Sequence, residues 1–95
     1  MTGKIKITSK GPAGKIHYTE GFLKKNTCEF YWEYGGEDTV ATVWFPTEEK
    51  WAAAYPWAAG RRKQILEFVA VQARKEMARS AKVKWEADRF HLVKS

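Results

Sequence analysis

The chain has 95 residues, a length that fits one domain. Its composition is 44% hydrophobic and 15% aromatic, including five tryptophans, which is enough apolar area for a core and excludes disorder as the ground state. The formal net charge is +6. This charge favours an acidic partner such as nucleic acid, but it also fits long side chains that only solvate a surface.

Cysteine content and hydropathy predict a cytoplasmic protein without membrane insertion. Cys28 is the single cysteine, which excludes an intrachain disulfide and favours a reducing compartment. The N-terminal stretch MTGKIKITSK has no apolar run of the kind found in signal peptides, and no window approaches 18 consecutive apolar residues. We therefore expect one soluble domain over residues 1–95.

The N-terminal segments carry the two-residue period of half-buried strands. Residues 3–9 place Ile5 and Ile7 on one side, and residues 15–20 resume the pattern after a Gly- and Pro-containing break. Because Gly and Pro favour turns, these segments predict a hairpin. The break reads GPAG without the Lys-Ser/Thr ending of a phosphate-binding loop, so that function is not supported. A second polar turn is expected at residues 24–26.

The clearest predicted hairpin joins residues 27–34 to residues 39–45. Its pairing places two sets of side chains on opposite faces. The face expected to support a helix carries Cys28, Phe30, Trp32, Tyr34, Thr39, Ala41, Val43 and Phe45. The opposite face carries Glu29, Tyr31, Glu33, Val40, Thr42 and Trp44.

This opposite face has two interpretations. Curling of the sheet or the C-terminal segment would cover its large side chains, since an antiparallel sheet needs only one dry face. Alternatively, Tyr31 and Trp44 form an aromatic contact patch for a partner or for dimerisation.

Two helices are expected after the hairpins. Thr47 is a candidate N-cap, followed by two acids in the first turn of a short helix. Tyr55 precedes a proline and is pushed away from helical geometry, which predicts a break. The long helix is expected over residues 56–80, with its apolar stripe at helical spacing. That stripe consists of Ile65, Leu66, Val69, Ala73 and Met77.

In the C-terminal segment, apolar and polar residues alternate again, with Val83 and Trp85 on one side. The apolar residues then move from odd to even positions, at Phe90 and Leu92. A shift of parity indicates a bulge or a short turn near residues 87–89. The segment can pair as a fifth strand beside the first. The expected fold is therefore α+β and two-layered: a mostly antiparallel sheet, made of a four-strand meander plus a C-terminal strand, with one long, N-terminally kinked helix on one face.

Residues suited to metal binding or catalysis are scattered. His17, Cys28 and His91 lie on three separate segments without ligand-like spacing. Nucleophilic catalysis needs a partly exposed thiol beside a base, whereas the pattern places Cys28 inside and His17 outside. The sequence thus indicates no metal, no cofactor and no enzymatic activity.

Basic residues concentrate on the long helix and the strand after it. Eight Lys or Arg residues and two acids fall between Arg61 and Lys84, which equals the whole net charge of +6. Arg62 lies close to the apolar stripe, which is explained either by a structural contact, for example with Glu49, or by an anion site. The anion-binding candidates are Arg61, Arg62, Lys75, Arg79, Lys82 and Lys84.

Two hypotheses for function follow. The first, which the sequence favours because the basic excess is modest, is a small non-enzymatic module that binds a protein partner or itself as a homodimer, through Tyr31, Trp44 and Val71. The second is binding of nucleic acid or another polyanion through the basic helix face and the following strand.

Overall fold

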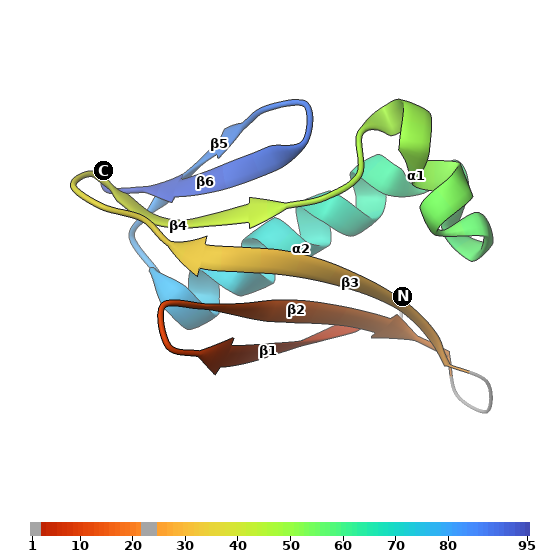
Figure 1. Ribbon diagram of the computed structural model, residues 1–95, viewed down its shortest axis with the longest axis horizontal. Coiled ribbons are helices and arrows are strands. Elements are labelled where there is room, and N and C mark those ends of the chain that lie inside the picture. Colours follow the sequence, from red (N-terminus) through yellow and green to blue (C-terminus); the bar gives the residue numbers. More distant parts are fainter. Residues whose placement is uncertain (1–2, 22–24) are drawn as a thin grey trace.

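The computed structural model describes residues 3–21 and 25–95 as an α+β fold built on one antiparallel sheet (Figure 1). Six strands are ordered β1-β2-β3-β4-β6-β5 across the sheet. Their bounds are β1 Lys4–Lys10, β2 Ala13–Glu20, β3 Asn26–Tyr34, β4 Thr39–Trp44, β5 Lys82–Trp85 and β6 Arg89–Val93. The turn expected at residues 24–26 includes Lys24, which lies outside the described residues.

The expected hairpins form with the predicted parity. In β1 and β2, Ile7 pairs with Ile16, and Gly11 takes a positive φ of 66° in the turn between them. In β3 and β4, Trp32 pairs with Val43 and Tyr31 with Trp44. Because the side-chain period of a strand is two, this register places one set of residues inside and the other outside.

Two residues of that hairpin differ from the prediction. Tyr34 was expected on the buried face, but it is 55% exposed at the end of β3, where its ring packs edge-on against Trp32. Val40 was expected on the opposite face. It lies at the irregularity in the β4–β6 register and packs against the core, because the bulge turns its side chain inward.

The C-terminal segment forms two strands, and its expected pairing beside the first strand is wrong. β6 pairs with β4 on one side and with β5 on the other. The parity shift is a short turn, in which Phe90 lies opposite Trp85. On the side of this hairpin that faces the helix, Phe90 and Leu92 are buried, Val83 packs against the core, and Trp85 stays 44% exposed.

Three helical elements follow β4: α1 (Glu48–Ala54), a 3-10 turn η1 (Pro56–Ala58) and α2 (Arg62–Met77). The long helix therefore begins later than the expected residue 56. Pro56 belongs to η1, and Gly60 takes a φ of 80° just before α2, so the chain changes direction between separate helices. Thr47 is the N-cap residue of α1, although its side chain makes no capping hydrogen bond.

The core lies between α2 and one face of the sheet. The predicted stripe is buried at Ile65, Leu66, Val69 and Ala73, while Met77 packs against its margin. Figure 1 shows α2 crossing the sheet diagonally, with α1 at one end of it. Trp51 joins α1 to η1 through a 2.9 Å hydrogen bond from its indole Nε1 to the Ala58 carbonyl.

Candidate functional site

The face of the sheet that points away from α2, here called the outer face, is not covered by any helix of the described residues. Its strands contribute seven Lys or Arg side chains and two Glu side chains, assigned from the pairing register. The two acids are Glu29 and Glu33. The cations are Lys4, Lys6, Lys10, Lys15, Lys82, Lys84 and Arg89.

Four side chains form a row across the middle of this face, here called the aromatic row. Lys15 on β2 pairs with Tyr31 on β3, Tyr31 pairs with Trp44 on β4, and Trp44 pairs with Arg89 on β6. The two ring centroids are 5.4 Å apart with the rings tilted by 37°. The Arg89 guanidinium lies 5.7 Å from the centre of the Trp44 ring, a cation–π distance. Two aromatic rings are thus flanked by one cation on each side.

Polar contacts hold the β2 end of the row. The Lys15 ammonium lies 2.6 Å from a Glu29 carboxylate oxygen, and the Tyr31 hydroxyl donates a 3.0 Å hydrogen bond to Glu33. The hydrogen bond from Lys15 lowers the pKa of the Glu29 carboxyl. The Tyr31 ring itself stays 47% exposed, so part of its surface is open to a ligand.

Polar contacts also position the other end. The Arg89 guanidinium donates two hydrogen bonds to the neighbouring Asp88, at 2.9 and 3.1 Å, and this lowers the pKa of the Asp88 carboxyl. Beside Arg89, the His91 ring contacts the Thr42 hydroxyl at 2.8 Å and the Glu86 carboxylate on its other nitrogen. Asp88 and Glu86 lie in the turn between β5 and β6 and reduce the positive charge at this border of the outer face.

The structure separates the anion-binding candidates. Lys82 and Lys84 project from β5 onto the outer face, with Lys84 opposite His91. Lys75 lies in the last turn of α2, in the other layer, and Arg79 lies in the turn between α2 and β5. The six residues therefore do not make one surface.

Arg61 joins a network that connects the segment before α2 to β2. Its guanidinium donates two hydrogen bonds to the Glu20 carboxylate, which also accepts a hydrogen bond from the buried Tyr18 hydroxyl. The guanidinium also lies 5.9 Å from the Trp57 ring. The charge of Arg61 is thus largely compensated within the fold.

Arg62 has a structural environment. Its Nε donates to the Pro46 carbonyl at 3.1 Å and one terminal nitrogen donates to the Ala87 carbonyl at 2.8 Å. The guanidinium lies 5.2 Å from the Phe45 ring. Arg62 therefore connects the start of α2 to the ends of β4 and β5, and the suggested contact with Glu49 is replaced by contacts with backbone carbonyls.

The protein-interaction candidates are also divided. Tyr31 and Trp44 lie together on the outer face, whereas Val71 is 43% exposed on α2. Sequence reasoning missed Lys15 and Arg89 as neighbours of the aromatic pair. The alternation of its strand places Lys15 on the outward side, so the sequence held a usable signal for this residue. The placement of Arg89 depends on the pairing of β6 with β4.

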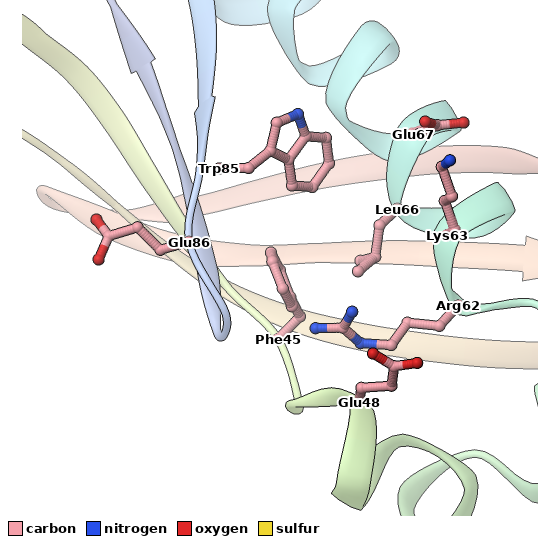
Figure 2. A pocket seen from close by; sticks show the side chains of 8 residues that line it. All are labelled: Phe45, Glu48, Arg62, Lys63, Leu66, Glu67, Trp85 and Glu86. Carbon is pink, nitrogen blue, oxygen red and sulfur yellow. The ribbon is translucent and has the colours of Figure 1, made fainter.

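A separate pocket of about 410 Å³ lies between α2 and the β5–β6 hairpin (Figure 2). Phe45, Leu66 and the half-exposed Trp85 supply its apolar walls. Figure 2 shows the Arg62 guanidinium extending toward the Phe45 ring and the Glu86 carboxylate pointing away from the other lining side chains. Three acids, Glu48, Glu67 and Glu86, and two cations, Arg62 and Lys63, line the pocket, so it has no strong excess of either charge.

The residues considered for catalysis remain apart. Cys28 is fully buried, and this burial raises the pKa of its thiol to about 12. A thiol with such a pKa is protonated at neutral pH and is a poor nucleophile. Within residues 3–21 and 25–95, no three His, Cys, Asp or Glu side chains gather as a metal site requires. None of the helices in these ranges is long and apolar enough to cross a membrane.

Comparisons with protein-family models, with curated proteins and with solved structures give no match for this chain.

Proposed function

We propose that the protein binds nucleic acid or another polyanion on the outer face of its sheet. The observation that supports this most directly is the aromatic row on a basic sheet face that no described helix covers. Clustered lysines and arginines attract a polyanion over a long range and release its counterions on contact. This proposal keeps Lys82 and Lys84 from the sequence-based candidates and moves the rest of the site from the helix to the sheet.

The proposed activity is binding alone, without catalysis, metal or cofactor. With it we keep the cytoplasmic location expected from the sequence, which the single reduced cysteine supports. The buried, protonated Cys28 thiol supports a structural role for that residue.

Binding of a protein partner through Tyr31 and Trp44 is the second candidate. The half-exposed Tyr31 ring supports it, because large exposed aromatic side chains are enriched in interfaces. The positive charge of the outer face distinguishes a second copy of this chain from an acidic protein as the partner. Two copies of the same basic face would repel each other, so an acidic protein surface suits this face better than a homodimer does.

The test compares charge removal on the two layers. We would measure binding of a labelled oligonucleotide by fluorescence anisotropy over a range of salt concentrations. The Lys15→Gln/Lys84→Gln variant should reduce the slope of log affinity against log salt by about 1.4, since each lost contact to a single strand removes about 0.7. The matched variant Lys75→Gln/Arg79→Gln removes the same charge from the helical layer and should leave the slope unchanged.

Two results would contradict the proposal: no salt-dependent binding at all, or a larger effect of the helix variant than of the sheet variant. Light scattering on the same samples tests the second candidate. A concentration-dependent dimer that ignores the oligonucleotide would favour self-association instead.

A further inference from the structure

We infer that the occupant of the outer face is a single nucleic-acid strand, whose bases stack on Tyr31 and Trp44 while its phosphates contact the cations beside them. This inference rests on the proposed function and names its ligand class. It separates one strand from the duplexes, sulfated polysaccharides and acidic peptides that the charge alone would also attract.

The rings provide the reason to expect bases. Tyr31 is 47% exposed even though it packs against Trp44, so the pair presents aromatic surface to solvent in the middle of a charged face. Base stacking on aromatic side chains contributes about 1–3 kcal/mol per base in single-strand binding proteins. A polysaccharide or an acidic peptide offers few rings to stack, and a duplex keeps the faces of its bases inside.

The flanking cations provide the reason to expect phosphates close to those bases. Lys15 lies on the strand next to Tyr31, and Arg89 lies on the strand next to Trp44. Both form exposed ion pairs, with Glu29 and Asp88, so a phosphate can replace part of each carboxylate contact. Neighbouring strands of a sheet are about 4.8 Å apart, so the four side chains of the row span roughly 14 Å. A ligand laid across the strands would therefore meet a cation, two rings and a second cation in sequence.

The margins of the outer face extend the basic surface beyond the row. The β1 lysines Lys4, Lys6 and Lys10 are exposed on one edge strand, and Lys82 and Lys84 are exposed on the other. The row itself continues to Thr8 on β1 and to Glu86 opposite Arg89, so a bound strand reaches these further cations beside the line of the row. These contacts involve charge and ring faces more than the edges of bases, so little sequence preference is expected.

The experiment compares four ligands of matched length at one salt concentration. They are a mixed-sequence single strand, its duplex, the same strand with abasic sites in place of its bases, and heparin. The wild-type protein should bind the single strand more tightly than the duplex or the abasic strand. Trp44→Ala and Tyr31→Ala should each weaken single-strand binding about 5-fold to about 150-fold, which corresponds to about 1–3 kcal/mol.

Controls separate stacking from folding and charge. Trp44→Phe and Tyr31→Phe keep a ring and should retain most of the affinity, while neither alanine variant should change heparin binding more than about twofold. Circular dichroism and a melting curve verify that each variant is folded. Tyr31 is a secure site for this test because its ring is half exposed.

The outcomes distinguish the inference from the proposed function. Salt-dependent binding of every polyanion, with equal affinity for the intact and abasic strands and no effect of the alanine variants, would overturn the inference and leave polyanion binding in place. Tighter binding of the duplex would also overturn it. Failure to bind any of the four ligands would overturn both.

Discussion

Trp44 and Arg89 lie opposite each other on β4 and β6. In the chain, these two strands are separated by α1, η1, α2 and β5. The contact between the guanidinium and the indole ring depends on the return of the chain to the sheet, where β6 pairs between β4 and the edge strand β5. The proposed site is therefore assembled by the topology of the sheet.

Replacement of Arg89 by lysine should weaken single-strand binding without changing its salt dependence. Lysine keeps the charge but loses the planar group that lies over Trp44 and donates twice to Asp88. A planar guanidinium can also stack on a base of the ligand, whereas an ammonium cannot; a contact of this kind contributes about 0.5–1 kcal/mol, so affinity should fall about two- to fivefold. Anisotropy titrations at several salt concentrations measure both quantities, and Lys84→Arg serves as the control. An unchanged affinity would show that the planar group has no role.

Removal of the Arg62 side chain should destabilise the fold. Arg62→Ala deletes two hydrogen bonds to backbone carbonyls and the contact with Phe45, which together connect α2 to β4 and β5. Because the group is only partly buried, we expect a loss of about 1–3 kcal/mol in the free energy of unfolding. Urea denaturation measures it against Lys63→Ala, which should change stability by less than about 0.5 kcal/mol. Equal effects of the two variants would contradict this structural role for Arg62.

Stability should decrease in acid through Glu20. Hydrogen bonds from Arg61 are the main cause that lowers the pKa of this carboxyl below its ordinary value of 4.5. A carboxyl whose pKa is lower in the folded state than in the unfolded state stabilises the fold fully at pH values above its unfolded-state pKa. This contribution is lost as the pH falls through its folded-state pKa. The stability difference between wild type and Glu20→Gln should therefore be largest above about pH 5 and should shrink below pH 4.5. Urea titrations at several pH values give this difference, and a constant difference would contradict the role of the carboxylate charge.

The Cys28 thiol should be unreactive in the folded protein. Its side chain is fully buried, and burial raises its pKa to about 12, so the thiolate is scarce at pH 8. Reaction with a colourless aromatic disulfide that releases a coloured thiol should proceed only as fast as the protein opens. It should become rapid in denaturant. Fast labelling under native conditions would show that the thiol is accessible.

Much of the fold could be predicted because local pattern determines it. Alternation in β3 and β4 predicted the buried set that includes Phe30 and Val43, and helical spacing predicted the stripe of α2. The start of α2 was predicted too early. Pro56 begins a separate 3-10 turn, and Gly60 takes a positive φ after it, so the α-helix starts only at Arg62.

Only part of the candidate site could be predicted from the sequence. Pairing within a hairpin brought Tyr31 and Trp44 together in the prediction, since a short loop fixes that register. The position of Arg89 was not accessible, because long-range pairing of β6 with β4 has no signature in local periodicity. For the same reason, charges that are close in sequence, such as Lys75 and Lys84, were grouped although the fold places them in different layers.

The most direct test of polyanion binding by the outer face is a titration of the ¹⁵N-labelled protein with a short mixed-sequence single strand, followed by NMR. We predict chemical-shift changes at the Trp44 indole and at the backbone amides of Lys15, Tyr31 and Arg89, and almost none along α2. Changes concentrated around Lys75 and Arg79, or no changes at any ligand concentration, would contradict the account.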